Sequence, residues 1–273
     1  MALIEMQHIS KAFGAVRALD DVSLYVNPGE VLGIVGDNAA GKSTLMKILT
    51  GAYHADSGRI LLNYRPVEIT KPEDSRRLGI EMVYQDLALV NSLDVVGNLY
   101  LGQELVKRKI GPLRWLDNKA MRAGAERMIA NLHIEITDPT QDVEHLSGGQ
   151  RQAVAVGRAT LFDAKLVIMD EPTAALSLLA IGQVLRLIGQ LARRGIAVIL
   201  ISHRLDDVIA AANRVIVLRQ GQIVAVHVVT KNKVDEFRQT LLADMEGIAR
   251  ADKDSGIREL RPNSGASCGI API

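Results

Sequence analysis

The sequence has a single cysteine and almost no net charge. Cys268 is alone among 273 residues, which excludes an internal disulfide and fits a reducing compartment. Lysine and arginine total 32 against 31 aspartates and glutamates, so the formal net charge is +1. This balance gives no global electrostatic field, and we expect no nucleic-acid partner.

Long apolar runs are also absent. None approaches the roughly 20 residues of a membrane-spanning helix. The opening MALIEMQHIS lacks the basic and apolar regions of a signal peptide. We therefore expect a cytoplasmic chain that reaches a membrane only through a partner.

Short apolar runs alternate with amphipathic segments along most of the chain. Continuous apolar runs bounded by turn residues are typical of parallel strands covered on both faces. The pattern predicts strands at 3–8, 22–26, 31–35, 59–62, 80–84, 166–169, 196–201, 214–218 and 222–229. It predicts helices at 42–50, 117–132, 178–194, 205–212 and after Gln150. The alternation indicates an α/β fold with a doubly wound, mostly parallel sheet.

The segment GDNAAGKST matches the phosphate-loop pattern G-x-x-x-x-G-K-[ST]. VLGIV before it reads as a buried strand, and TLMKILT after it is amphipathic. Backbone N–H groups of such a loop face nucleotide phosphates, and the helix that follows directs its positive end at the same oxygens. A glycine turn with a chance lysine is the plainer alternative. The predicted phosphate-binding residues are Gly36, Asp37, Asn38, Ala39, Ala40, Gly41, Lys42, Ser43 and Thr44.

Asp170 and Glu171 follow the apolar run LVIM at a predicted strand end. In open α/β sheets, ligands bind at this edge. We expect Asp170 and the Ser43 hydroxyl to hold Mg²⁺, while Lys42 offsets phosphate charge and Glu171 positions and deprotonates an attacking water. The alternative, a strand end followed by an acidic helix cap, is less favoured once a phosphate loop lies upstream.

The segment LSGGQ at residues 146–150 precedes a predicted helix. This segment resembles the signature of the ATP-binding cassette family. So does the order of phosphate loop, LSGGQ, Asp-Glu and histidine along the chain. The resemblance implies that Ser147, Gly148 and Gly149, with Gln150 beside them, bind the γ-phosphate of ATP held by Lys42 of another copy. Two copies would then share each site. A serine-glycine loop that only caps a helix is the alternative.

Three further positions match the family. Gln85, in VYQD, resembles the Q-loop glutamine that senses Mg²⁺ and water. His203, in VILISHRL, resembles the switch histidine that contacts the γ-phosphate. Phe13 matches the aromatic residue that stacks on adenine. Since only 3% of residues are aromatic, a phenylalanine in this polar stretch is less easily a core residue. A structural histidine and a core phenylalanine are the alternatives.

Two positions depart from the family pattern. Ala39 stands where the family often has glycine, and Ser177 stands where it usually has aspartate. That aspartate helps to organise the dimer interface. Ser177 therefore bears on coupling between copies rather than on nucleotide binding.

The resemblance covers about residues 3–230 and is strongest to the ATP-binding subunits of bacterial importers for simple sugars, of the ribose, xylose and fructose kind. It rests on ISKAFGAVRALDDVSL, GDNAAGKSTLMKILTGAY and GIEMVYQDLALV, with NAAGKST and GPLRWLD closest to the fructose type. It implies an ATPase that uses ATP and Mg²⁺ and works as a homodimer. The chain would dock through part of 86–116 on a permease at the inner face of the cell membrane, and serve a sugar-binding protein indirectly.

Other functions fit less well. A cassette ATPase acting on DNA or ribosomes would need a coiled-coil insertion or a second cassette, and neither is present. A phosphotransferase would not explain LSGGQ or His203. An importer subunit for another small solute, and a binder that holds ATP without turnover, stay open.

The resemblance also predicts the domain organisation. We expect one domain over 1–246, with a nucleotide-binding core at about 1–85 and 150–246. A helical subdomain would occupy about 86–149, where strand signals thin out. Residues 247–273 are richer in glycine, serine, proline and charge, so we expect a poorly ordered tail.

Overall fold

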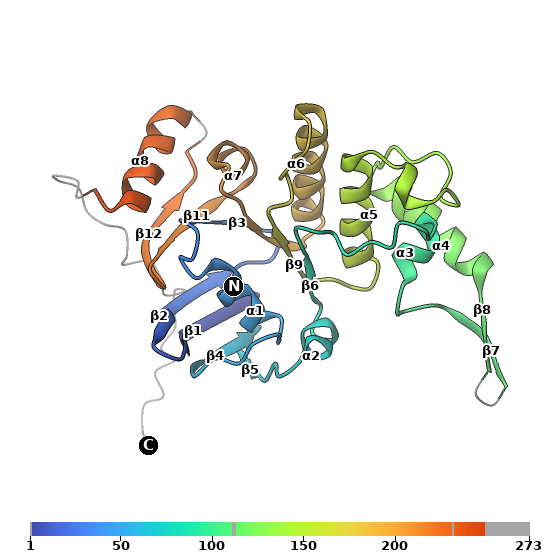
Figure 1. Cartoon of the computed structure of the whole chain (residues 1–273), viewed down its shortest axis with the longest axis horizontal. Helices are drawn as coiled ribbons and strands as arrows, with labels where there is room; N and C mark the ends of the chain where they lie inside the picture. Colours follow the sequence, from blue (N-terminus) through green and yellow to red (C-terminus); the bar gives the residue numbers. More distant parts are fainter. Residues whose placement is uncertain (1, 111–112, 231, 249–273) are drawn as a thin grey trace, which may run out of the picture.

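The computed structural model describes residues 2–110, 113–230 and 232–248 (Figure 1). A six-stranded sheet in the order β12-β11-β3-β10-β9-β6 lies at its centre. Its strands are β3 (Val31–Val35), β6 (Ile80–Val83), β9 (Leu166–Asp170), β10 (Ala197–Ile201), β11 (Arg214–Arg219) and β12 (Gln222–Val228). Neighbours from β11 to β6 are parallel, and β12 joins antiparallel. Every residue of β3 and β10 is buried, as expected for parallel strands with both faces covered.

A second, antiparallel sheet in the order β2-β1-β4-β5 carries the N-terminal strands. It consists of β1 (Ile4–Phe13), β2 (Val16–Val26), β4 (Ser57–Leu62) and β5 (Arg65–Val67). One face of the central sheet packs toward this sheet and toward helix α1 (Lys42–Leu49), with Leu32, Ile34 and Ile168 in that core. The other face, with Val167, Met169 and their neighbours, packs against the helices of the second core.

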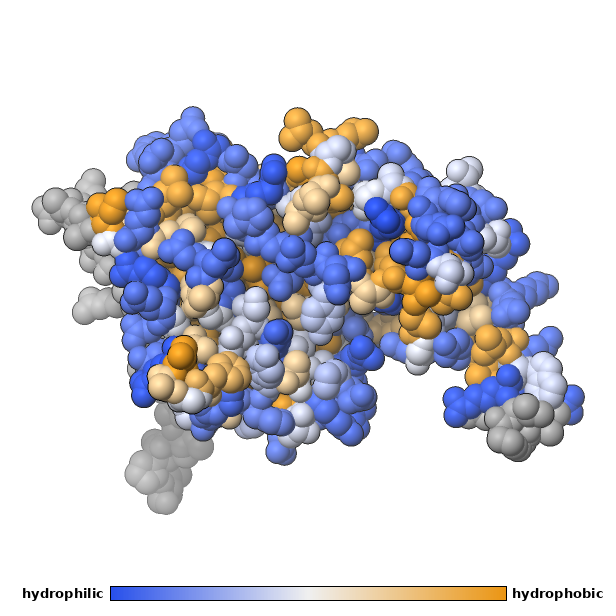
Figure 2. Space-filling model, viewed as in Figure 1, coloured by the Kyte–Doolittle hydropathy of each residue, from blue (hydrophilic) through white to orange (hydrophobic). Residues whose placement is uncertain are grey.

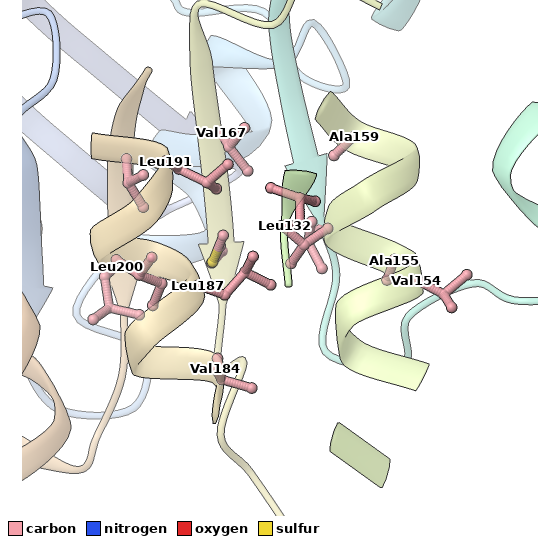
Figure 3. Close-up of a cluster of buried hydrophobic side chains, with 14 of the residues drawn as sticks. Leu132, Val154, Ala155, Ala159, Val167, Val184, Leu187, Leu191 and Leu200 are labelled. Atoms are coloured by element: carbon pink, nitrogen blue, oxygen red, sulfur yellow. The ribbon is translucent and has the colours of Figure 1, made fainter. Parts of the chain in front are cut away.

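Several helices of the second core come from the later half of the chain. They include α6 (Leu178–Arg193), α7 (Leu205–Ala211) and α8 (Val234–Glu246). Helix α5 (Gly148–Thr160) packs beside α6, and Figure 3 shows Ala155 and Ala159 of α5 facing the side chains of α6 and β9. The small residues of α5 allow this close approach. In the described residues, no helix combines the length and apolar content needed to cross a bilayer.

Most expected elements are confirmed, and the fold class is α/β as predicted. The expected helices at 42–50, 117–132, 178–194 and 205–212 match α1, α4 (Asn118–Asn131), α6 and α7 to within one residue at each end. The strands expected at 214–218 and 222–229 form the β11–β12 hairpin, and its turn residues Gln220 and Gly221 have φ angles of 47° and 77°. Both residues lie in the left-handed region that a two-residue hairpin turn favours.

Two predicted strands were wrong in extent. Strand β1 runs on to Phe13 and β2 begins at Val16, well beyond the predicted 3–8 and 22–26. In the unpredicted parts of both strands, most residues are exposed or half-buried, and Ile9 and Leu19 are the buried exceptions. Backbone hydrogen bonds between β1 and β2 hold these parts in the sheet. Because their side chains need not be apolar, no apolar run marks them in the sequence.

Several elements had no prediction. They are β5, α2 (Pro72–Arg77), α3 (Val95–Tyr100), β7 (Val106–Ile110), β8 (Leu113–Leu116), the 3-10 turn at Val143–His145, and α8. The β7–β8 hairpin projects from the region expected to be helical (Figure 1). Of the expected tail, only Gly247 and Ile248 lie within the described residues.

Candidate nucleotide site

A pocket of about 560 Å³ opens beside the phosphate loop. The loop between β3 and α1, the carboxyl end of β9 and the segment after β6 meet there, because β9 pairs with both β6 and β10 in the parallel sheet. The predicted residues that line the pocket are Phe13, Asn38, Ala39, Ala40, Gly41, Lys42, Ser43, Thr44, Gln85, Asp170 and Glu171. The fold thus gathers most of the predicted site.

The two anchoring glycines of the loop are required by close backbone contacts. A Cβ on Gly36 would lie 2.1 Å from the carbonyl oxygen of Leu218, and one on Gly41 would lie 2.6 Å from that of Ala18. Both glycines also have positive φ angles, 151° and 107°. Larger residues would force the loop out of position. Ala39, which departs from the family pattern, has φ 66°. This left-handed backbone conformation is less strained for glycine than for a residue with a Cβ.

Lys42 holds its own loop together. Its Nζ donates to the carbonyl oxygens of Gly36 at 2.6 Å and Asp37 at 2.9 Å. Burial lowers the pKa of the Lys42 ammonium, while the nearby carboxylates of Glu171, Asp170 and Asp37 raise it. The half-buried Lys42 ammonium is suited to an anionic ligand such as a phosphate group.

The two carboxylates after β9 have different surroundings. Burial, and then the adjacent charge of Glu171, raise the pKa of the Asp170 carboxyl, with Lys42 and Lys47 acting in the opposite direction. Glu171 is held by the end of β10: its Oε1 accepts from the backbone N–H of His203 at 2.9 Å, and its Oε2 lies 2.7 Å from His203 Nδ1. The backbone N–H of Glu171 donates to Ile201 at 2.9 Å. This arrangement fixes the Glu171 carboxylate at the mouth of the pocket.

His203 does not line the pocket directly but reaches it through Glu171. Its side chain is 66% exposed, against 15% for Glu171. The exposed imidazole is accessible to a ligand or to a second chain. The contact between His203 and Glu171 needs β9 and β10 to be neighbours, and the pairing of Asp170 with Ile201 provides that.

Phe13 lies at the pocket and outside the core. Its ring is 44% exposed and stands edge-on to Tyr53 at 5.3 Å between ring centroids. Lys11 Nζ lies 5.5 Å from the same centroid. The exposed ring at the rim of the pocket suits a planar ligand better than it suits the protein interior.

The site also contains residues that sequence reasoning did not single out. Val16, Arg17 and Ala18, at the start of β2, line the pocket with Gln220 of the hairpin turn. Arg17 and Ala18 lie within the quoted stretch ISKAFGAVRALDDVSL, but no motif distinguishes them there. Gln220 comes close only because β11 is next to β3.

The LSGGQ residues lie apart from this pocket. In the single chain, Ser147 caps α5: its Oγ accepts from the N–H of Gln150 at 3.3 Å, and Gln150 Oε1 accepts from the N–H of Ser147 at 2.9 Å. Gln150 Nε2 donates to the carbonyl oxygen of Glu135 at 2.5 Å. The amide of Gln150 is therefore used within its own chain. Among the described residues that line the pocket, none comes from 147–150.

A parallel sheet, a phosphate loop with Lys42 and an Asp-Glu pair at the adjoining strand end together define a P-loop nucleotide hydrolase. The family model described as ABC transporter matches residues 19–174. The chain therefore belongs to the ABC transporter family, and it is an ATP-binding, ATP-hydrolysing transporter subunit.

Curated relatives cover most of the chain. It is 42% identical to the xylose/arabinose import ATP-binding protein XylG of Sulfolobus acidocaldarius, over 88% of this chain and 93% of that protein. It is 42% identical to the fructose import ATP-binding protein FrcA of Rhizobium meliloti, over 81% of this chain and 86% of that protein. It is also 42% identical to the ribose import ATP-binding protein RbsA 1 of Burkholderia cenocepacia, but spans only 46% of that longer protein.

Solved structures share the fold. A nucleotide-free ATP-binding cassette from an ABC transporter has a TM-score of 0.76 and 28% identity, covering 90% of this chain and 97% of that chain. A dimeric cassette described in a post-hydrolysis state with ADP and Pi has a TM-score of 0.67 and 22% identity, covering 83% of this chain and 99% of that chain. The second likeness concerns the fold alone.

Proposed function

We propose that this chain hydrolyses ATP to power a membrane permease that imports a simple sugar of the xylose, ribose or fructose class. The observation that carries this proposal is the similarity to XylG and FrcA over most of both proteins' lengths. Import proteins named for xylose/arabinose, ribose and fructose are equally similar to this chain, at 42% identity. The class of solute is therefore proposed, and no single sugar is preferred.

The site residues have distinct proposed roles. The loop N–H groups and Lys42 bind the phosphates, and Phe13 stacks on the adenine ring. Two features support the lysine role: its place in the loop, and its charge beside the pocket. Lys42 would exchange its bonds to Gly36 and Asp37 for bonds to phosphate oxygens, which gains charge-assisted hydrogen bonds.

The donor set fits Mg²⁺. Carboxylate, hydroxyl and amide oxygens are the ligands this hard cation prefers, and Asp170, Ser43 and Gln85 supply them around one pocket. The raised pKa of Asp170 reflects a half-buried carboxylate beside a second one, an arrangement that a nearby cation relieves. When bound, Mg²⁺ supplies charge neutralisation on the phosphate oxygens.

Glu171 is the proposed base for hydrolysis. Its carboxylate would orient a water for attack on the γ-phosphorus and accept the proton that the water loses. The bond from the γ-phosphorus to the bridging oxygen breaks, and ADP leaves with that oxygen. His203, which contacts Glu171 at 2.7 Å, would hold the carboxylate and contact the γ-phosphate.

The active unit is proposed to be a pair of chains. The phosphate loop and the LSGGQ segment lie apart in one chain, with only the first lining the pocket. A second copy would bring its Ser147, Gly148 and Gly149 to the γ-phosphate. The glycines leave backbone N–H groups at the start of α5 open to an anion. Binding of ATP would close the pair, and hydrolysis would reopen it.

The transport role implies further partners and a location. We place the chain on the inner face of the cell membrane, held there by permease subunits, with a sugar-binding protein delivering the solute. The region proposed to dock is part of 86–116, which includes the exposed Leu101 and Trp115. An ATPase of this family outside transport, or an importer subunit for another small solute, are the remaining candidates.

Reconstitution tests the proposal. The chain is purified with its permease from the native cell and placed in proteoliposomes with the binding protein outside. Uptake of labelled xylose, ribose and fructose is then measured with and without ATP on the chain's side. ATP-dependent uptake of one sugar, lost in Glu171→Gln, is the expected result. Failure to recover any permease would favour a role outside transport. A permease complex active on none of the three sugars would point to another solute.

A further inference from the structure

Helix α6 begins with two leucines in water. Leu178 is 83% exposed and Leu179 is 74% exposed. The apolar face of the same helix is otherwise buried, including Ile181, Val184 and Leu187. Figure 2 shows hydrophobic atoms gathered at the free end of α6. The buried face of α6 is already packed without Leu178 and Leu179, so these two side chains do not contribute to the core of their own chain.

The first turn of α6 has no feature that suits exposure to solvent. A solvated helix start usually carries acidic residues, which interact favourably with the positive end of the helix dipole. None is present in the first turn of α6. Ser177 caps the helix through its Oγ, which accepts from the N–H of Ala180 at 3.4 Å. Ser177 thus performs the local capping that an aspartate would perform, but it brings no charge to the surface.

Leu178 and Leu179 lie next to the LSGGQ segment, residues 146–150. A Cβ on Gly148 would lie 2.9 Å from Leu176 Cδ2, and one on Gly149 would lie 3.1 Å from the Cβ of Ala180. The start of α6 and the start of α5 are therefore packed together. Whatever approaches the LSGGQ segment from outside also approaches the first turn of α6.

We propose that Leu178 and Leu179 form an apolar contact with a second copy of this chain when ATP closes the pair. This inference rests on the proposed shared site, which places a second copy against Ser147 to Gly149. In a two-fold pair both copies present the same surface, so both leucine pairs lose water at once. Burial of these side chains stabilises the closed pair where Ser177 supplies no charge.

Dimerisation with ATP tests the contact. The background is Glu171→Gln, which keeps ATP from being consumed. Sedimentation velocity over a concentration series with ATP and Mg²⁺ gives the dimer dissociation constant. The test variant adds Leu178→Ser and Leu179→Ser. The matched control adds Val228→Ser and Ile248→Ser, two exposed apolar residues of similar exposure, 72% and 60%, on β12 and beyond α8. A fluorescent ATP analogue reports nucleotide binding, and thermal melting reports folding.

The expected result is a dissociation constant raised roughly tenfold or more in the leucine variant. Nucleotide affinity of the monomer, melting temperature and the control variant's dimer constant are expected to stay unchanged. Equal dimer constants in the leucine variant and the control would overturn the contact while leaving the shared site standing. Equal dimer constants combined with loss of permease co-purification would assign the leucines to the permease instead. If the background variant binds ATP but stays monomeric at every concentration, the shared-site proposal is refuted, and the proposed leucine contact is refuted with it.

Discussion

Replacing Glu171 by glutamine separates binding from chemistry at this site. The Glu171 carboxylate accepts from the His203 backbone N–H at 2.9 Å and lies 2.7 Å from its Nδ1. Glutamine keeps the size of the side chain and one acceptor oxygen, so the backbone hydrogen bond survives. Its amide N–H can donate to a neutral imidazole nitrogen. The substitution therefore removes the base while leaving the frame of the site in place.

The expected loss follows from the role assigned to Glu171. A positioned general base contributes roughly 10²- to 10⁴-fold in rate, which corresponds to about 2.7–5.5 kcal/mol of barrier. Nucleotide binding depends on the loop and Lys42, so the affinity for ATP should change by less than about threefold, well under the roughly tenfold that 1.4 kcal/mol represents. Lys42→Ala, in contrast, should lose ATP binding and turnover together, because it removes the point charge of the phosphate loop.

The assay is specific ATPase activity across a protein concentration series, with nucleotide titration in parallel. Glu126→Gln is the matched control, because Glu126 is a half-exposed surface glutamate paired with Arg122 at 3.0 Å. It should leave both quantities unchanged. Specific activity should rise with concentration if two copies share the site. Glu171→Gln turning over within threefold of the parent would refute the assignment of the base, and activity constant down to low concentration would refute the shared site.

Three further predictions concern stability. Ala39→Gly relieves about 1–2 kcal/mol of left-handed strain at φ 66°. Glycine also gives the unfolded chain more conformational entropy, which destabilises the fold by about 0.4–1 kcal/mol. A net gain of about 0 to 1.6 kcal/mol is expected in denaturant unfolding, and a loss would contradict the strain argument. Asp170→Asn should melt higher than the parent at pH 7 without nucleotide. Because the folded pKa of Asp170 is raised, its charge destabilises the fold above the unfolded pKa, and the difference should vanish as pH falls below about 3.9. An advantage that persists unchanged at low pH would rule out the charge as its cause. Arg214→Ala should cost about 3 kcal/mol, since it leaves the half-buried Glu30 without its cationic partner at 2.8 Å, although Glu30 Oε2 still accepts from Asn27. A cost under 1 kcal/mol in the same unfolding experiment would show that the pair is dispensable.

The chemistry of the phosphate loop was predictable because it is local. Gly36 and Gly41 are needed where the backbone turns back on its neighbours, and that requirement is visible as a fixed spacing along the chain. The buried strands β3, β9 and β10 were predictable for a similar reason, since uninterrupted apolar composition marks a strand covered on both faces.

Other elements carry weaker local signals. Helix α8 buries only Phe237 and Leu241, so its apolar stripe is thin and its sequence resembles a solvated segment. Strand β7 contains the basic run Lys107-Arg108-Lys109, which lacks the alternation of apolar and polar residues that marks a half-buried strand. In both cases the local sequence signal is too weak to predict the element.

The sequence by itself determined which groups are available: a phosphate loop, two carboxylates after an apolar strand, a glutamine, a histidine and an LSGGQ turn. Only the tertiary structure decided which of them meet. Glu171 and His203 are 32 residues apart and touch because β9 and β10 are adjacent, whereas Ser147 is 24 residues from Glu171 and lies on another surface. Strand order in a parallel sheet is set by long-range packing of buried faces, and separation along the chain does not report it.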